Sequence, residues 1–400
     1  MNDSKARMKR RALGRVAFSA SLLLAMSSTA QAISFTALGD LPGGSFASYA
    51  NGISADGKVV VGRGTSASGT EAFRWTADGG MVGLGDLPGS DFESVGNGVS
   101  ANGETVVGAS ASSSGYQAFR WTPTTGMVGL GYLPGDQFNS RATAVSGDGS
   151  LVVGTGAVAA GQEAFRWTPS IGILGLGDLP GGYFESQGSA ISTDGRVVVG
   201  RAQSALGMEP FMWTLAGGMV GLGDLPGGLY RGDAYAVSSD GRVIVGYADS
   251  ASGSEAFRWT AEGGMVGLGI LPGGRYSTAK AVSADGSVVV GYSETFYGSQ
   301  SEAFIWDTAY GMRLLSDVLI NDFGLGDELA SWKLYDARGI SADGLTIVGY
   351  GDGPSGEGQA WMVDLHPTSP APVPEPSTLL LLASGLAGLG GIVWRRHRRR

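Results

Sequence analysis

The chain has 400 residues, of which 27 are Lys or Arg and 36 are Asp or Glu, so its formal net charge is −9. It contains no cysteine and only two histidines, His366 and His397. These counts exclude disulfides and cysteine metal ligands, and they deprive residues 33–365 of the histidine that a Ser-His-Asp triad or a histidine zinc site needs. We expect no cofactor and no metal site.

Residues 1–32 have the pattern of a secretory signal peptide. A mostly apolar stretch runs from Val16 to Met26, and Ala30-Gln31-Ala32 has the form of a cleavage site. The basic residues that precede it are Lys5, Arg7, Lys9, Arg10, Arg11 and Arg15. We expect Ala30 and Ala32 to direct cleavage before Ile33, which makes the secretory translocon a predicted partner.

The chain is strongly acidic once both terminal basic clusters are set aside. Residues 33–394 carry 16 basic and 35 acidic side chains, a net charge of −19. Such a surface disfavours nucleic acid and anionic lipid as partners, so we expect no nucleic-acid binding.

Residues 33–365 contain an internal repeat of about 46 residues. A segment like Ala-Phe-Arg-Trp recurs at that spacing, and an Asp-Gly or Asn-Gly pair recurs in step with it. The 70 glycines are therefore periodic, and they mark turns rather than disorder. The tryptophans that end the segments are Trp75, Trp121, Trp167, Trp213, Trp259, Trp306 and Trp361.

Each repeat is predicted to form four short strands. In the first repeat, one strand ends at Ile53, and Asp56-Gly57 turns it back as a tight hairpin because glycine supplies the positive φ that such turns need. The next strands are Val59–Val61, Glu71–Trp75 and Met81–Gly85. Four strands per repeat of this length are typical of a propeller blade; a β-solenoid, whose coils are usually shorter, is the competing interpretation.

The two ends of the repeat region complement each other. Residues Ile33–Gly39 match a fourth strand with no first three before it, and the last repeat stops at Leu365 after its third strand. Pairing these segments completes a blade and leaves no exposed edge. We therefore predict an all-β protein, a seven-bladed β-propeller over residues 33–365 that is closed by the N-terminal strand. The last repeat also has an insertion, in which we predict a short helix or lid over Asn321–Trp332.

The least repetitive positions are the best candidates for a binding site, because structural demand repeats and function need not. The residue two places before each conserved Ile or Val of the first strand is predicted to line the central channel. Tyr235, Lys280 and Arg338 fall on consecutive blades and form a basic and aromatic sector that suits a small anionic ligand, although solvated channel walls are the simpler interpretation. The full set is Asn51, Asn97, Thr143, Ser189, Tyr235, Lys280 and Arg338.

Three other repeated groups have a structural and a functional interpretation. The tryptophans either pack between blades or stack on sugars. The acids before Leu-Pro-Gly, such as Asp40 and Asp178, either cap their own turns or bind Ca²⁺, for which no suitable spacing exists. The aromatic residues after Leu-Pro-Gly, such as Phe46 and Phe138, either pack on the neighbouring blade or offer a glycan surface.

The C-terminal part reads as a membrane-sorting tail. A Pro-rich linker, residues 366–376, ends in Val373, Pro374, Glu375 and Pro376. An apolar run from Thr378 to Trp394 follows, and six residues from Arg395 to Arg400, five of them arginine, complete the segment 377–400. The run is long enough to span most of a bilayer as one helix, and the arginines would stay cytoplasmic.

In this order the motif, apolar span and basic tail resemble the PEP-CTERM sorting signal of Gram-negative bacteria. The resemblance implies an exosortase-like sorting enzyme as partner, which acts near the Pro-Glu-Pro motif. It also implies that the chain crosses the inner membrane, is anchored there transiently by the C-terminal helix, and then reaches the cell surface or the extracellular space.

The Phe-x-Trp and Leu-Pro-Gly motifs resemble HAF-type extracellular repeats over Leu38–Leu365, and the Ser-x-Asp-Gly hairpin is similar to that of TolB-like propellers. We expect a non-enzymatic structural or binding protein; the PEP-CTERM resemblance further implies association with exopolysaccharide or biofilm matrix. The alternative is a propeller glycan lyase or hydrolase that uses carboxylates and Tyr.

Overall fold

A computed structural model describes residues 33–89, 91–135, 137–294 and 301–367. The predicted signal peptide with Ala30 and Ala32, the sorting motif Val373–Pro376 and the segment 377–400 lie outside the described residues. Among the residues it describes, no helix is long and apolar enough to cross a membrane.

Consecutive strands form antiparallel groups of four, each a meander from an innermost to an outermost strand. The first groups are β2 (Gly43–Ile53), β3 (Val59–Ser66), β4 (Gly69–Thr76) and β5 (Gly80–Gly83), then β6 (Ser94–Val99), β7 (Val106–Ser112), β8 (Gly115–Thr122) and β9 (Gly126–Gly129). The next are β10 (Ser140–Val145), β11 (Val152–Val158), β12 (Gly161–Thr168) and β13 (Gly172–Gly175), then β14 (Gly181–Ile191), β15 (Val197–Ser204), β16 (Met208–Thr214) and β17 (Gly218–Gly221).

The remaining groups follow the same plan. They are β18 (Gly227–Val237), β19 (Ile244–Ser250), β20 (Gly253–Thr260) and β21 (Gly264–Gly267), then β22 (Ser277–Val282), β23 (Val288–Glu294), β24 (Ser301–Asp307) and β25 (Gly311–Leu314), and finally β26 (Lys333–Ile340), β27 (Thr346–Asp352) and β28 (Gly358–Asp364) with β1 (Ser34–Ala37). Single parallel bridges, Gln162 to Glu185 and Met208 to Arg231, join three neighbouring groups into one sheet of twelve strands.

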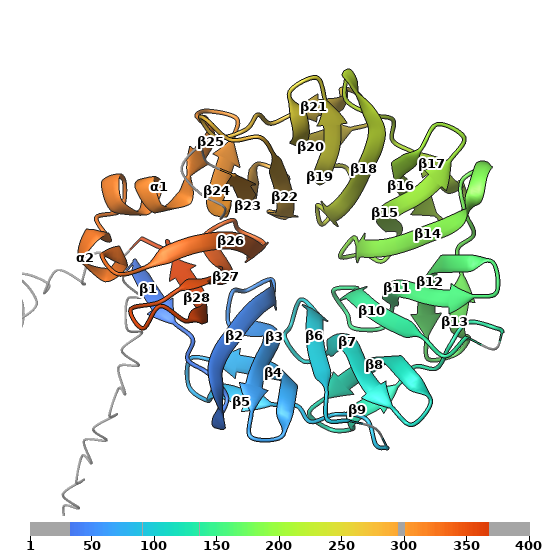
Figure 1. Ribbon diagram of the computed structural model, residues 1–400, viewed down its shortest axis with the longest axis horizontal. Coiled ribbons are helices and arrows are strands. Elements are labelled where there is room, and N and C mark those ends of the chain that lie inside the picture. Colours follow the sequence, from blue (N-terminus) through green and yellow to red (C-terminus); the bar gives the residue numbers. More distant parts are fainter. Residues whose placement is uncertain (1–32, 90, 136, 295–300, 368–400) are drawn as a thin grey trace, which may run out of the picture. The chain divides into compact units, whose positions relative to one another are not determined.

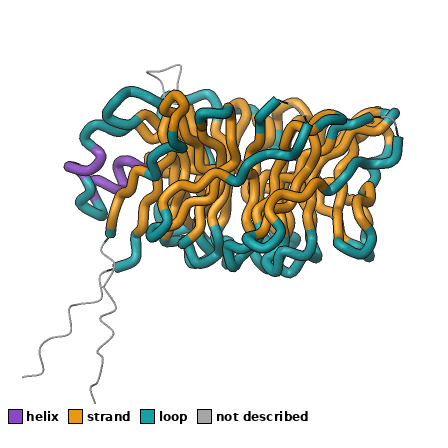
Figure 2. The backbone as a smooth tube through the Cα atoms, turned by 90° about the horizontal axis from the view of Figure 1, so that it is seen from below, coloured by secondary structure: helices purple, strands orange, loops and turns teal. Residues whose placement is uncertain are grey.

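The groups stand around a common centre, as in a β-propeller. Figure 1 shows the innermost strands β2, β6, β10, β14, β18, β22 and β26 facing that centre. Figure 2 shows that the strands run between two loop-rich faces. We call the face that holds the turns between innermost and second strands the turn face, and the opposite face, with the Leu-Pro-Gly loops, the loop face.

The N-terminal strand completes the last group of strands. Strand β1 pairs antiparallel with β28, with Ser34 opposite Asp364 and Ala37 opposite Trp361; Figure 1 shows the two side by side in blue and red. Without β1, the backbone groups of β28 would form an open sheet edge, which is a site for aggregation. The pairing with β1 therefore gives hydrogen-bond partners to the backbone groups on the outer edge of β28.

The hydrophobic core lies between neighbouring groups. In the cluster between the first two groups, Val59 and Val61 of β3 pack with Phe119 of β8 and with Leu84 and Leu87 of the intervening segment. Each third strand except β28 has one fully buried phenylalanine, namely Phe73, Phe119, Phe165, Phe211, Phe257 and Phe304. Each group is thus stabilised mainly by its neighbours.

The last repeat corrects one sequence assignment. Trp361 was aligned with Trp75, but in the structure it pairs with Gly349, just as Phe73 pairs with Gly62. Trp361 is therefore the counterpart of the buried phenylalanine, and it is itself fully buried. The counterpart of Trp75 is Val363, so the longer spacing of the last repeat arises from the segment with α1 and α2 that is inserted between β25 and β26.

The Asp-Gly turns are longer than the tight hairpins predicted. The amide of Gly57 (φ 74°) donates to the carbonyl of Ser54 at 3.0 Å, and the Ser54 amide donates to the carbonyl of Val59 at 2.9 Å. The Ser54 hydroxyl donates to the Asp56 carboxylate at 2.7 Å and accepts from the amide of Val59. Serine and aspartate side chains therefore stabilise a five-residue connection, and glycine occupies its single left-handed position.

The predicted helix is shifted toward the N-terminus. Helix α1 spans Leu315–Asn321 and α2 spans Gly326–Leu329, so only the second lies within residues 321–332. Leu315, Val318 and Leu319 are buried, which is the i, i+3, i+4 spacing of one helix face. This apolar helix face packs against buried residues of the last two strand groups, such as Ile305 and Leu334. The position of α1 is therefore set by contact with the core.

Candidate functional site

The structure places each of the channel positions predicted from the sequence at a β-bulge on an innermost strand. In the first group, Ala50 pairs with Gly62 and Gly52 with Val61, so Asn51 is skipped. The register skips Tyr235, Lys280 and Arg338 in the same way. A bulge re-aims the side chain of the extra residue, and here these side chains reach the neighbouring innermost strand.

Small polar residues at these positions connect neighbouring strands. The Asn51 side-chain amide donates to the carbonyl of Gly96 at 2.9 Å, and that of Asn97 donates to the carbonyl of Ala142 at 2.8 Å. The Thr143 hydroxyl lies 2.8 Å from the carbonyl of Gly188. Because each bond satisfies a backbone oxygen across a group boundary, this part of the predicted channel lining acts as a structural connection.

Tyr235 and Lys280 lie side by side in the structure. The Lys280 Nζ lies 3.6 Å from the centroid of the Tyr235 ring and 5.5 Å from that of Tyr292. Burial lowers the pKa of Lys280. The rings compensate part of this desolvation by cation–π attraction.

Arg338, on the next innermost strand, is bound by its own surroundings. Its Nε donates to the Asp336 carboxylate at 2.8 Å, and another guanidinium nitrogen donates to the Asn51 side-chain oxygen at 2.8 Å. Its guanidinium carbon lies 4.5 Å from the centroid of the Tyr350 ring. An anionic ligand would compete with Asp336 for this cation, so ligand binding by Tyr235, Lys280 and Arg338 stays a prediction.

Two buried acids complete this sector and were missed by sequence reasoning. Asp233 and Asp336 are 4% and 3% exposed. Burial raises the pKa of Asp233 to about 7, although Arg201, 3.7 Å away, and Lys280 oppose the rise. Each acid lies two residues before a predicted channel position on the same strand. This spacing in the sequence could have identified both acids.

At the turn face, neighbouring turns form hydrogen bonds with one another. The Ala55 amide donates to the carbonyl of Ala101, and the Ala342 amide of the last group donates to the carbonyl of Ala55 at 3.0 Å. The chain of hydrogen bonds runs through Ala55, Ala101, Gly147, Thr193, Ser239, Ala284 and Ala342, with a hydroxyl–hydroxyl bond of 3.0 Å from Thr193 to Ser239. These residues and the apolar ends of the innermost strands line a cavity of about 150 Å³.

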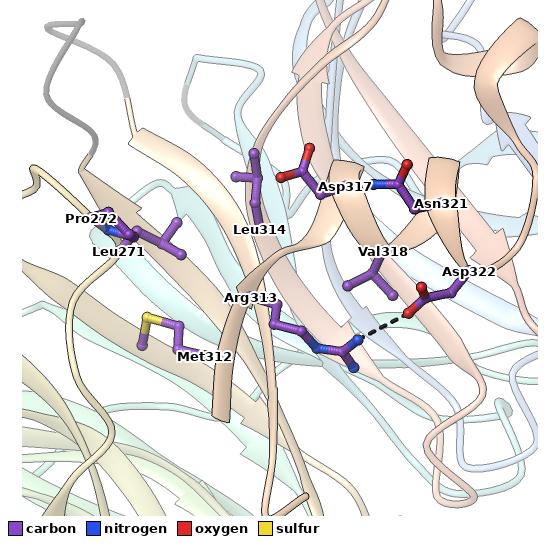
Figure 3. A pocket seen from close by; sticks show the side chains of 9 residues that line it. All are labelled: Leu271, Pro272, Met312, Arg313, Leu314, Asp317, Val318, Asn321 and Asp322. Atoms are coloured by element: carbon purple, nitrogen blue, oxygen red, sulfur yellow. Dashed lines mark hydrogen bonds and ion pairs between the residues drawn. The ribbon is translucent and has the colours of Figure 1, made fainter. Parts of the chain in front are cut away.

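Two larger cavities lie elsewhere. One, of about 460 Å³, lies beside α1 and is lined by Met312, Leu314, Val318 and neighbouring residues. Figure 3 shows Arg313 at its edge, where the guanidinium donates to the Asp322 carboxylate at 2.9 Å. The other, of about 400 Å³, lies between β10 and β14. We call it the amide pocket, and its lining residues are Asn139, Arg141, Thr143, Thr155, Gly156, Ala157, Gln162 and Gln187.

The acids before Leu-Pro-Gly accept backbone hydrogen bonds. An Asp40 oxygen accepts from the amide of Ala47 at 3.0 Å, and an Asp178 oxygen accepts from that of Glu185 at 3.0 Å. This geometry fits turn capping. Within the described ranges, no three His, Cys, Asp or Glu side chains are placed to hold a metal ion.

Comparison with known proteins assigns the C-terminal segment. Residues 372–399 match the PEP-CTERM protein-sorting motif. This stretch includes Val373, Pro374, Glu375 and Pro376, and the motif implies export and surface sorting in Gram-negative bacteria. No curated protein matches the chain.

Several solved structures are similar to this chain. An oligogalacturonate lyase from Vibrio parahaemolyticus has a TM-score of 0.52 at 10% identity, over 84% of this chain and 94% of the lyase. The β-propeller domain of the Trilobed protease from Pyrococcus furiosus gives 0.48 at 10% identity, over 80% and 94%. TolB from Acinetobacter baumannii has a TM-score of 0.41 at 12% identity. The match covers 80% of this chain and 64% of the length of TolB. At these identities the similarity concerns the fold alone.

Proposed function

We infer that this protein is exported, recognised by an exosortase-like enzyme through its tail, and delivered to the cell surface or matrix as a non-enzymatic binding or structural module. The observation that carries this proposal is the sorting motif at residues 372–399. The acidic character of residues 33–394 and the resemblance to HAF-type repeats support an extracellular location. Association with exopolysaccharide is what the sorting tail implies.

The module itself is proposed to be a closed propeller of seven blades. The hydrogen-bonded chain of turns supports this number, because it passes through one residue of each strand group and returns to Ala55. The pairing of β1 with β28 supports closure. A closed ring with bonded turns is a rigid scaffold, which suits a protein that must persist outside the cell.

A binding role fits the described carboxylates better than catalysis. Many recur from group to group in the same structural bond, as Glu71 and Glu163 do when they accept the amides of Gly85 and Gly177. A catalytic pair should break that symmetry. The alternative, a lyase or hydrolase acting on glycans, predicts new chain ends when the protein is incubated with a polyuronate; their appearance would overturn the non-enzymatic role.

The sorting proposal is tested by Glu375→Ala. This substitution leaves the apolar run unchanged but alters the motif, so we expect full-length variant in the inner membrane, while the parent reaches the surface without residues 395–400. Mass spectrometry of fractionated cells measures both. Glu357→Ala, an exposed acid outside the motif, is the matched control and should sort like the parent. Surface-located parent that retains Arg395–Arg400 would show that the tail is a permanent anchor.

A further inference from the structure

The lining of the ring differs between its two halves at one cross-strand position. The innermost and second strands pair Asp233 with Tyr247 and Asp336 with Tyr350, and in both groups the second strand contributes a large ring. The corresponding pair in the amide pocket is Arg141 with Thr155. The complete set on the second strands is Arg63, Ala109, Thr155, Arg201, Tyr247, Tyr292 and Tyr350.

The space left by the small residues is the amide pocket. Thr155, Gly156 and Ala157 of β11 form one wall, and Gln162 and Gln187 contribute their side chains from β12 and β14. Its volume of about 400 Å³ lies within the range of small-molecule sites. Because a tyrosine occupies the equivalent position in three other groups, the repeat does not require this cavity.

The polar groups of the amide pocket are suited to hydroxyl-rich ligands. Each glutamine or asparagine amide offers two donors and an acceptor, and a hydroxyl can both donate and accept. Gln187 Nε2 lies 2.8 Å from the Gln162 side-chain oxygen and 3.3 Å from the Glu185 carboxylate, so the two glutamines form a connected pair at the rim. Phe138, directly before Asn139 in the chain, is 55% exposed.

Arg141 adds one positive charge. Its guanidinium carbon lies 4.6 Å from the centroid of the Tyr116 ring, whose hydroxyl donates to the Glu93 carboxylate. In the described part of the chain no carboxylate lies within ion-pair distance of Arg141, and none is among the residues that line the pocket. A guanidinium that is held by a ring and has no acid partner among the described residues is suited to bind a ligand carboxylate through two parallel hydrogen bonds.

We propose that the amide pocket binds an acidic sugar, with Arg141 on the carboxylate and the side chains of Gln162, Gln187 and Asn139 on the hydroxyls. This deepens the proposed binding role and rests on it. The ligand is a uronic-acid unit, free or at the end or branch of a glycan. A simple carboxylate could bind only Arg141. A neutral sugar could form hydrogen bonds only with the side-chain amides of the pocket.

The test uses full-length protein in detergent and three probes: glucuronate, glucose and acetate. Ligand-observed NMR titration should give saturable binding of glucuronate, at least tenfold tighter than that of glucose or acetate. Arg141→Ala should weaken glucuronate binding at least tenfold. The matched control is Arg63→Ala, which removes an exposed arginine that also lies over a tyrosine ring, at 4.7 Å from Tyr49, and it should bind like the parent.

A second variant fills the pocket. Thr155→Tyr introduces the ring that other groups carry at this position, so it is expected to fold with the parental melting temperature and to lose glucuronate binding. Glucuronate binding that survives both Arg141→Ala and Thr155→Tyr overturns the site while leaving the surface role intact. Equal binding of acetate and glucuronate, or no binding of glucuronate by the parent, also overturns the proposal; sorting measured with Glu375→Ala is independent of either result.

Discussion

Gly149→Val tests the turn that the repeat uses in every group. Gly149 has φ of 74°, and a Cβ at this position would lie 2.4 Å from the Thr105 hydroxyl and 3.0 Å from its Cβ. A β-branched residue in the left-handed region costs about 1–2 kcal/mol, and forcing extra atoms against a packed neighbour adds about 1–3 kcal/mol. Because Thr105 is 4% exposed and has little room to move, we expect a total loss of about 2–5 kcal/mol in the free energy of unfolding.

The matched control separates the two contributions. Gly126 has φ of 66° with no atom within 4 Å of an added Cβ, so Gly126→Val should lose only the conformational part, about 1–2 kcal/mol. Urea denaturation followed by tryptophan fluorescence gives both values. Equal midpoints for the two variants would refute the packing argument, and a parental midpoint for Gly149→Val would refute the turn geometry itself.

Two further predictions concern closure and the buried acids. Deleting residues 33–38 removes β1 and exposes the edge of β28, so thermal unfolding should shift to lower temperature and lose cooperativity; a cooperative transition at the parental temperature would contradict the closure. Asp233 has a folded-state pKa of about 7, above its unfolded value of about 3.8, so its favourable contribution is complete below pH 4 and is lost as the pH rises toward 7. Asp233→Asn should therefore gain stability relative to the parent between pH 5 and pH 8 in urea titrations, and a constant difference across that range would show that the carboxyl does not titrate there.

The regular features of the fold were predictable because each has a local cause. Asp-Gly pairs mark turns through the positive φ of glycine, and Val59–Val61 has the continuous apolar character of a covered strand. The partnership of β1 with β28 followed from the missing strand at each end of the repeat region. These inferences needed only sequence periodicity and the rule that sheet edges must be covered.

The irregular features depend on contacts that sequence periodicity does not encode. The sequence placed Lys280 beside Tyr235, but it did not show the bulges that bring these two side chains into contact. Nor did it indicate that Asp336 already binds Arg338. The amide pocket escaped prediction for a similar reason, because a cavity is defined by the absence of side-chain volume at Thr155, which becomes visible only when the cross-strand pairs of all groups are compared.

The pairing of β1 with β28 has a consequence for the proposed export of the chain. Ser34 and Asp364 face each other across 330 positions of sequence, so in the proposed export the first strand to emerge can pair only after the last strand has emerged. The predicted membrane span begins at Thr378, fourteen positions after Asp364, and fourteen extended residues reach at most about 50 Å. Under the proposed sorting route, we therefore expect this strand pairing to form while the tail still holds the chain, so that the sorting enzyme acts on a folded domain.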